Sequence, residues 1–386
     1  MNINSLTRLK LSALLKKRGA KPVHILKIFK ALHAQWLDIS GLPGIPTKVI
    51  KALQNCPVTS LKIVGRRESQ DGTIKYLLEL ADGLKIESVL ITQGTANERY
   101  CACLSSQVGC AMGCAFCATA ALKSRRDLTT GEIVEQFRIM RDEVKKLPGN
   151  KDSEHRNSTV INSIVFMGMG EPLDNLDNVI DAIDILTDNH GYNFASSKIT
   201  VSTCGIVPKM KELGRRTKVN LALSLHAVDD VLRTRLMPIN RRYGIKKVLA
   251  ACKRFPNLAK KSIMIEYLLL KGINDSDEDA IRLARVLDFP CIVNLISYNG
   301  VGRGFSKPED SRVKAFERIL VSEEIRTFIR QSKGEDIEAA CGMLVGEGKL
   351  PEPTFRPEFI KKMNKIFKQK SIKIGTVENL RERYEK

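Results

Sequence analysis

Three cysteines lie close together in the first third of the chain and could bind one soft metal centre. They occur in the sequence Cys110-Ala-Met-Gly-Cys114-Ala-Phe-Cys117. Thiolates are the ligands of many zinc sites and of iron–sulfur clusters. A zinc site usually takes four ligands and favours pairs of cysteines separated by two residues, so it would need Cys103 as its fourth ligand. The observed spacing, with no partner pair nearby, instead favours an iron–sulfur cluster that leaves one iron open for a further ligand.

Polar residues also follow several segments that we expect to be strands. They are Gly170, Glu171, Ser202, Ser224, His226 and Asn299, with Leu225 between two of them. In parallel α/β architectures, ligands bind beyond the carboxyl ends of the strands. We therefore expect these groups to converge on the same face as the three cysteines. Each residue alone is a weak signal, because a glycine can serve only a turn and a histidine can be a core residue.

The elements that must position these residues alternate between strand-like and helix-like patterns from about Tyr100 onwards. The expected strands are residues 100–105, 163–167, 198–203, 220–226, 263–270, 291–298 and 326–330. Expected helices lie between them, including residues 132–147, with a capping box from Thr129 to Glu132, and residues 176–187. The alternation predicts parallel βαβ units, in either a doubly wound sheet or a full or partial barrel.

The N-terminal part of the chain has a different pattern. From Leu9 to about Asn55, apolar residues recur at spacings of three and four with basic residues between them, which predicts a small helical module. The turn at residues 41–46 is typical of a helix-hairpin-helix phosphate binder, although short turns of this kind are common. Alternation with a period of two follows between Leu61 and Thr92 and predicts a short β segment.

Composition limits the class of protein. The chain has 386 residues, 43% of them hydrophobic, which excludes disorder, collagen and a repetitive coiled coil as descriptions of the whole. Lys and Arg number 63 against 43 Asp and Glu, so the net charge of +20 makes a polyanion such as nucleic acid the first candidate partner, with general solubility as the alternative. No apolar run is long enough for a membrane helix or a signal-peptide core. We therefore expect a cytoplasmic protein whose ten cysteines do not form a disulfide framework.

Six ordered motifs resemble one family. They are residues 103–110, 166–173, 201–203, 224–226, 237–240 and 339–344. Together they resemble the radical S-adenosylmethionine (SAM) superfamily and, more closely, the RlmN/Cfr family of RNA adenine methyltransferases. The resemblance extends from the helical module to about Gly346. Pro172 after Glu171 favours the RlmN branch, which methylates C2 of adenine, over the sister branch, which methylates C8.

The resemblance implies a fold, cofactors and a chemistry. It implies a partial (β/α)6 radical-SAM barrel in which Cys110, Cys114 and Cys117 bind a 4Fe-4S cluster. It further implies that SAM, two molecules per turnover, is held by Gly170, Glu171, Ser202, Ser224, Leu225, His226 and Asn299. This chemistry meets a physical demand, because C2 of adenine is an electron-poor ring carbon and cannot attack a sulfonium methyl group as a ring nitrogen would. A radical route is therefore required.

Three further residues take roles by the same resemblance. Cys341 would accept a methyl group and carry it to the base. Cys103 would then attack Cys341 and release the methylated adenine in a transient disulfide, which requires the two thiols to lie close in space. Glu87 would be the proton acceptor, although a glutamate on a strand is ordinarily part of a solvated face. Neither Cys101 nor Cys204 matches a catalytic position.

The resemblance also implies partners and a domain organisation. The expected partners are 23S ribosomal RNA, transfer RNA and a low-potential electron donor such as flavodoxin or ferredoxin, with the enzyme acting as a monomer away from membranes. The expected domains are a helical RNA-binding accessory domain (1–60), a β linker (61–98), a radical-SAM catalytic core (99–346) and a basic tail (347–386). A zinc-stabilised RNA-binding protein without catalysis and an iron–sulfur electron carrier are the alternatives from other classes.

Overall fold

The computed structural model describes residues 2–35, 39–54, 56–93, 99–146, 160–256, 263–300 and 304–346. These residues belong to one compact unit, Met1–Pro351. The polar stretch at 148–157, whose sequence predicts a surface loop, and the predicted tail at 347–386 lie outside the described residues. In the part of the chain that is described, no helix is both long and apolar enough to cross a membrane.

Ten strands form one sheet in the order β1-β2-β3-β4-β7-β8-β9-β10-β11-β12. The strands from β4 to β12 in this order run parallel to one another. Their bounds are β4 (Arg99–Cys103), β7 (Val160–Phe166), β8 (Ile199–Thr203), β9 (Asn220–Ser224), β10 (Ile263–Leu269), β11 (Cys291–Ser297) and β12 (Thr327–Arg330). All seven predicted strands of this region are present, and the α/β fold of a partial barrel is confirmed. These seven parallel strands are one more than the predicted (β/α)6 barrel contains, and β12 is the additional strand.

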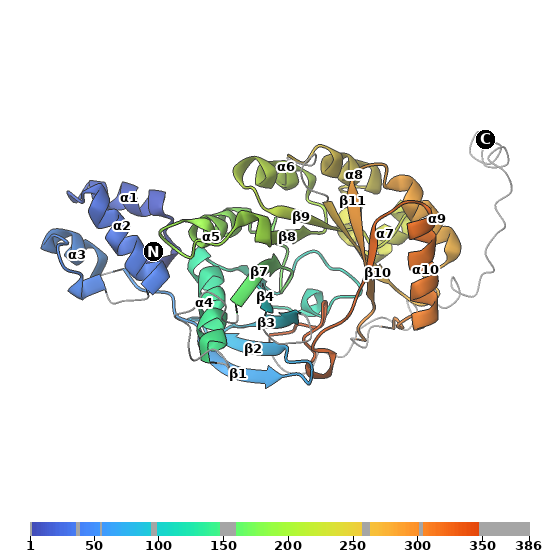
Figure 1. Cartoon of the computed structure of the whole chain (residues 1–386), viewed down its shortest axis with the longest axis horizontal. Coiled ribbons are helices and arrows are strands. Elements are labelled where there is room, and N and C mark those ends of the chain that lie inside the picture. Colours follow the sequence, from blue (N-terminus) through green and yellow to red (C-terminus); the bar gives the residue numbers. More distant parts are fainter. Residues whose placement is uncertain are drawn as a thin grey trace. The chain divides into compact units, whose positions relative to one another are not determined.

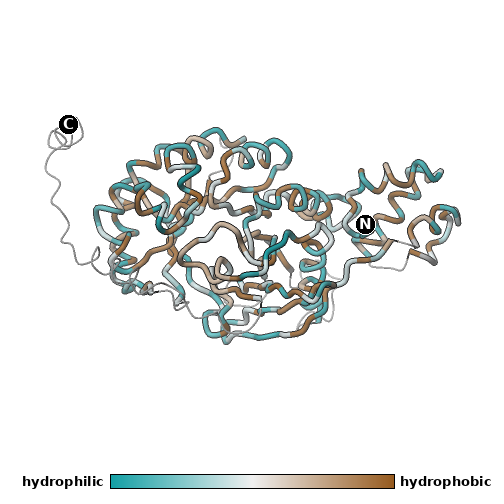
Figure 2. Tube along the Cα trace, turned by 180° about the vertical axis from the view of Figure 1, so that it is seen from behind, coloured by the Kyte–Doolittle hydropathy of each residue, from teal (hydrophilic) through white to brown (hydrophobic). Residues whose placement is uncertain are grey.

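Helices connect the parallel strands and cover the sheet (Figure 1). They are α4 (Thr130–Lys146), α5 (Leu176–Thr187), α6 (Val207–Arg216), α7 (Asp230–Leu236), α8 (Ile245–Lys253), α9 (Asp277–Val286) and α10 (Asp310–Ser322). Because both faces of such a sheet are covered, its strands read as apolar runs, as in the sequence Ile-Met-Ile-Glu-Tyr-Leu-Leu of β10. Figure 2 shows these apolar stretches along the strands and more hydrophilic residues on the outer helical turns.

The predicted β segment is not a separate linker in space, because it extends the main sheet. The strands β1 (Lys62–Glu68), β2 (Ile74–Glu79) and β3 (Lys85–Gln93) pair antiparallel, and β3 pairs antiparallel with β4. We call β1–β3 the antiparallel extension and the strands β4 and β7–β12 the parallel part. One sheet therefore contains two parts with different strand directions.

The N-terminal helices are α1 (Arg8–Lys16), α2 (Pro22–Lys30) and α3 (Thr47–Gln54). Their buried apolar residues, such as Leu11 and Phe29, belong to the same hydrophobic cluster as those of the sheet. Ion pairs from Arg8 to Asp188 and from Lys10 to Asp181 add polar contacts with the region of α5. The helical module therefore shares its core with the rest of the unit.

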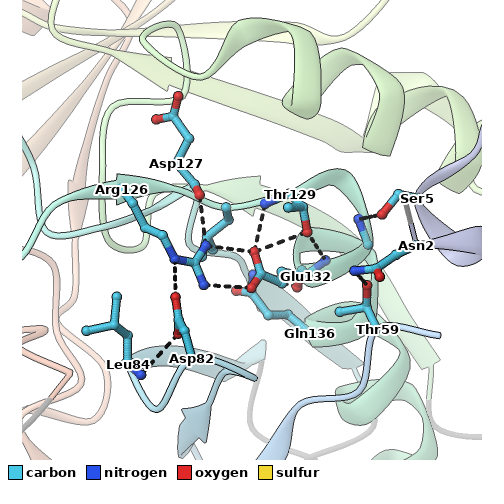
Figure 3. A network of polar contacts seen from close by, with 12 residues as sticks. Asn2, Ser5, Thr59, Asp82, Leu84, Arg126, Asp127, Thr129, Glu132 and Gln136 are labelled. Atoms are coloured by element: carbon cyan, nitrogen blue, oxygen red, sulfur yellow. Dashed lines mark hydrogen bonds and ion pairs between the residues drawn. The ribbon is translucent and has the colours of Figure 1, made fainter. Parts of the chain in front are cut away.

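The start of α4 joins three parts of the chain (Figure 3). The predicted capping box is confirmed, since Glu132 accepts from Thr129 N at 2.8 Å and Thr129 Oγ1 accepts from Glu132 N at 3.3 Å. The Arg126 guanidinium lies 2.8 Å from this carboxylate and 2.6 Å from the carboxylate of Asp82. Asp82 is in the turn between β2 and β3. Gly131 N donates to Ser5 Oγ of the N-terminal segment at 2.9 Å. This network fixes α4 to the antiparallel extension and to the N-terminus.

Candidate active site

The three predicted cluster cysteines lie on one short segment that follows β5 (Gln107–Val108), and all three line a single cavity. Gly109 lies in the left-handed region at φ +68°, and a Cβ there would come within 2.4 Å of Ser124 O. Glycine is therefore needed for the chain to turn into the cysteine segment. Further along, Ala115 N donates to Leu236 O at 2.9 Å and fixes the segment against the end of α7.

The cysteine segment has the donor set of an iron–sulfur cluster. Cys110 is buried, and Cys114 and Cys117 are partly buried. Burial raises the pKa of Cys110 to about 12 and that of Cys114 well above its usual range, with the neighbouring thiols as a further cause. Cys110 and Cys114 therefore need a metal cation to become thiolates, since a coordinating thiol is deprotonated outright. No three His, Cys, Asp or Glu side chains of the described residues are grouped tightly enough for a single ion. As a set of three cysteine thiols, these residues would suit an iron–sulfur cluster, which thiolates hold.

Gly170 and Glu171 follow β7 and form another wall of this cavity. Gly170 has φ +99°, and a Cβ there would lie 2.6 Å from Gln107 Cβ, so the close approach of the two segments requires glycine. The buried Glu171 carboxylate accepts hydrogen bonds from Cys204 N at 2.8 Å and Leu173 N at 3.0 Å. Burial raises the pKa of Glu171 in spite of these bonds. Glu171 thus connects the end of β7 to the end of β8.

Ser202, Ser224 and His226 line the same cavity from the ends of β8 and β9. His226 adopts φ +60°, and its Nδ1 accepts from Leu268 N at 3.0 Å. Its ring packs edge-on against Phe116 of the cysteine segment, with 5.0 Å between ring centroids. Burial, aided by the charge of Arg233, lowers the pKa of His226 to about 3, so the imidazole is neutral. Its other nitrogen, Nε2, therefore carries the proton.

The other two residues that we predicted to hold SAM have different positions. Leu225 is buried and does not line the cavity, although its N–H donates to Glu266 O at 3.1 Å and secures the same strand end. Asn299 lines a second, neighbouring cavity, where its Nδ2 donates to Cys341 O at 3.3 Å. Its Oδ1 accepts from Ser332 Oγ at 2.7 Å. Asn299 therefore contacts the segment that carries Cys341.

The second cavity brings Cys103 and Cys341 together. Cys341 also lines the first cavity, as do Met167 and Arg330, so the two cavities adjoin. All ten cysteines are free thiols, so the predicted disulfide is not formed in this structure. Burial raises the pKa of Cys103 well above its usual range. The resemblance required two distant cysteines to be neighbours, and the fold places them on one cavity.

Glu87 lines neither cavity. It is buried on β3, where its Oε1 lies 3.0 Å from Lys75 Nζ and its Oε2 accepts from Val345 N at 2.7 Å. Gly346 N donates to the same Oε2 at 3.3 Å. Both oxygens of this carboxylate are therefore engaged with the chain itself.

Two arginines at the site were not predicted. Arg330 ends β12 and lines both cavities, and the neighbouring Cys341 and Glu266 raise its pKa, so it is a permanent cation beside the thiols. The rule that found Ser202 and His226, a polar residue at the end of a strand, would also have found Arg330. The fully buried Arg233 donates to Leu225 O, Ser224 O and Cys204 O at 3.0, 3.1 and 2.8 Å. It lies on a helix, and no pattern in the sequence distinguishes it.

Known proteins show the same combination of sequence and fold. A family model described as the Radical SAM superfamily matches residues 160–284, from β7 into α9. A protein of Geotalea uraniireducens named dual-specificity RNA methyltransferase RlmN is 41% identical over 90% of this chain and 97% of its own length. A protein of Geobacter sulfurreducens with the same name is 40% identical over 90% of this chain and 92% of its own.

A solved structure agrees with these relatives. The crystal structure of a radical SAM methyltransferase from Sphaerobacter thermophilus superposes with a TM-score of 0.79, at 37% identity, over 90% of this chain and 100% of the other. The chain belongs to the RlmN family of the radical SAM superfamily.

Proposed function

We propose that this protein methylates C2 of adenine in RNA, with SAM and a 4Fe-4S cluster as cofactors and both 23S ribosomal RNA and transfer RNA as substrates. The observation that carries the proposal is the convergence of three cluster cysteines, the strand-end polar residues and Cys341 on one cavity. The relatives named as dual-specificity RNA methyltransferases support the substrate class. A zinc-stabilised binding module would not need Cys341 at the same cavity.

The residues of the first cavity are suited to hold the two cofactors. Cys110, Cys114 and Cys117 bind the cluster, and Gly170, Glu171, Ser202, Ser224 and His226 line the remaining wall, where SAM binds. When bound, the cluster supplies an electron that cleaves SAM to a radical able to remove a hydrogen atom, a chemistry that belongs to the cofactor.

The residues at the junction of the cavities handle the methyl group. Cys341 lines both cavities, so it can receive the methyl group on the cofactor side and present it on the side of Cys103. Cys103 then loses its proton and attacks the sulfur of Cys341. An S–S bond forms while the bond from that sulfur to the new methyl carbon of adenine breaks, and this carbon takes the electron pair and a proton. A reductant reopens the resulting disulfide. Asn299 holds the Cys341 backbone at 3.3 Å through its amide. A low-potential donor such as flavodoxin or ferredoxin supplies the electrons.

The N-terminal helical module is suited to contact RNA. Residues 1–60 contain ten Lys and Arg and one Asp. Exposed basic residues of the module include Lys16, Lys17, Arg18, Lys21, Lys30, Lys48 and Lys51. Each cation that neutralises a phosphate releases condensed counterions, so affinity for RNA should fall steeply with salt. We therefore assign residues 1–60 as the accessory RNA-binding domain.

The identity of the methylated nucleoside tests this function. The protein is reconstituted anaerobically with iron and sulfide, then incubated with SAM, a reductant and unmodified ribosomal or transfer RNA. Chromatography with mass detection of the digested RNA should show 2-methyladenosine. Formation of 8-methyladenosine would assign the chain to the sister chemistry, and an unmethylated RNA with unconsumed SAM would overturn the proposal.

A further inference from the structure

The segment that carries Cys341 is held from two sides. It follows β12 and runs through a short 3-10 helix (Glu335–Ile337) to Gly346. On one side it contacts the cluster-binding segment, where Ala118 N donates to Gly342 O at 2.7 Å and Thr119 Oγ1 donates to Leu344 O at 2.7 Å. Hydrogen bonds from residues close to Cys341 therefore join its segment to the two residues that follow Cys117.

On its other side the segment contacts the antiparallel extension. Gly334 N donates to Asp71 Oδ2 at 3.0 Å, and Asp336 Oδ1 accepts from Ser69 Oγ at 2.6 Å. These two contacts lie in the turn between β1 and β2. They secure the start of the segment, before Cys341, to the edge of the sheet opposite β12.

A buried ion pair of the antiparallel extension makes further contacts with the segment. Lys75 on β2 and Glu87 on β3 are diagonal neighbours, because Glu87 is in register with Leu77. Their side chains are only 6% and 7% exposed, and Lys75 Nζ lies 3.0 Å from Glu87 Oε1. A charge pair buried this deeply is strongly destabilised when one partner is removed, because the other charge is left without compensation.

The same pair holds the Cys341 segment at two points. Lys75 Nζ donates to Glu338 O at 3.1 Å, three residues before Cys341. Glu87 Oε2 accepts from Val345 N at 2.7 Å, four residues after it. Just beyond, Gly346 lies so close to β3 that a Cβ would be 2.6 Å from Lys85 O. The stretch from Glu338 to Val345 is thus fixed at both ends by one ion pair.

We infer that Lys75 and Glu87 are positioning residues that hold the methyl-carrying Cys341 at the junction of the two cavities. The antiparallel extension serves as the platform on which the Cys341 segment is docked. Glu87 acts through that segment, because it lines neither cavity and both of its oxygens are hydrogen-bonded or ion-paired within the chain. The inference rests on the proposed function in one respect, because the proposed function is what identifies Cys341 as the residue that carries the methyl group.

Hydrogen–deuterium exchange of the full chain tests the clamp without any methyl transfer. We expect the peptide from Cys341 to Gly346 to exchange at least about tenfold faster in Glu87→Gln and Lys75→Met than in the wild type. The double variant Lys75→Met/Glu87→Gln leaves no unpaired buried charge, so its stability should recover while the exchange stays fast. Unchanged exchange in all three folded variants would overturn the inference.

Glu135→Gln is the matched control. Glu135 is a buried carboxylate, 1% exposed, whose ion-pair partner Arg138 lies on the same helix α4. Its substitution also removes a buried negative charge and should destabilise the protein. The Cys341–Gly346 peptide should nevertheless exchange at the wild-type rate. Faster exchange in this control as well would mean that general destabilisation loosens the segment, and the clamp would be refuted.

A comparison of the two methyl transfers separates positioning from proton transfer. In Glu87→Gln, a positioning role predicts that methylation of Cys341 by SAM without RNA and transfer to RNA both slow together, with an unchanged pH profile. A proton acceptor predicts normal Cys341 methylation and a block only at the RNA step, which would overturn the inference. If the wild type transfers no methyl group at all, the proposed function fails, while the exchange experiment still reports on the clamp.

Discussion

The parallel part and the antiparallel extension belong to one sheet but serve the site in different ways. The parallel part places polar side chains at strand ends, so that residues that follow β7, β8 and β9 meet around one cavity. The antiparallel extension contributes none of the predicted cofactor residues and instead holds a distant segment through side chains on its face. The comparison teaches that the cofactor site depends on topology, whereas the position of Cys341 depends on a few buried contacts.

The largest difference between the two parts should be seen when a cluster ligand is removed. Cys114→Ser takes away one of three thiolates, so the reconstituted protein should lose its full complement of about four irons and all RNA methylation. Iron and sulfide analysis and the visible absorption spectrum measure the first effect. Cys341→Ala should keep its iron while losing methylation, and Cys56→Ser, outside both cavities, should keep both. Full iron binding by Cys114→Ser would refute the ligand assignment.

The next largest effect is expected at the strand ends of the parallel part. Arg233→Met removes the donor for the carbonyls of Cys204 and Ser224 and for Asn240 Oδ1, at a cost of at least about 3 kcal/mol in the free energy of unfolding. Urea denaturation measures the loss, and binding of SAM should weaken with it. The exposed Arg216, paired with Asp177 and Glu212, is the control, and Arg216→Met should cost less than about 1 kcal/mol. Equal losses for the two variants would contradict this account of Arg233.

Acid should destabilise the parallel part through His226. The unfolded chain takes up a proton as the pH falls below 6.5, whereas the folded chain does not until about pH 3, so stability present above pH 6.5 is lost on acidification. Between pH 7.5 and pH 5 this loss should be about 2 kcal/mol for the metal-free protein. His226→Asn keeps an acceptor for Leu268 N and tolerates the positive φ, so urea denaturation should show a smaller loss in this variant. An identical pH dependence in the wild type and the variant would be the contrary result.

The smallest effect is expected where the two parts are joined, at the start of α4. Thr129→Ala removes the acceptor for Glu132 N and should cost about 1 kcal/mol, as helix caps generally do. Thr129→Ser keeps the hydroxyl and should restore most of the stability. Because the cap contacts neither cavity, iron content and exchange of the Cys341–Gly346 peptide should stay at the wild-type level in both variants. Altered exchange in that peptide would show that the start of α4 also controls the position of the Cys341 segment.

Much of the parallel part could be predicted from the sequence because its signals are local. Apolar runs separated by helical patterns identify the strands, and three cysteines within eight residues predict a metal centre from their spacing alone. The strand-end rule placed Ser202, Ser224 and His226 correctly at the cavity. It did not distinguish Leu225, whose side chain points into the core one residue before His226.

The rest depends on contacts between residues far apart in the chain. Cys103 and Cys341 could be paired only by the family resemblance, because no local pattern relates them. Glu87 read as an ordinary strand residue, and its engagement with Val345 N and Lys75 becomes visible only when the segment after β12 is placed beside β3. Arg233 was missed because most of its partners are backbone carbonyls, which no sequence pattern reveals.

The most direct test of the central claim follows one methyl group from SAM to RNA through Cys341. The reconstituted wild type and Cys341→Ala are incubated with deuterium-labelled SAM, a reductant and RNA, and the Cys341 peptide and the RNA nucleosides are then analysed by mass spectrometry. The account predicts a labelled methyl group on the wild-type Cys341 peptide and labelled 2-methyladenosine in the RNA, and neither label in the variant samples. Equal methylation of RNA by the wild type and Cys341→Ala would contradict it.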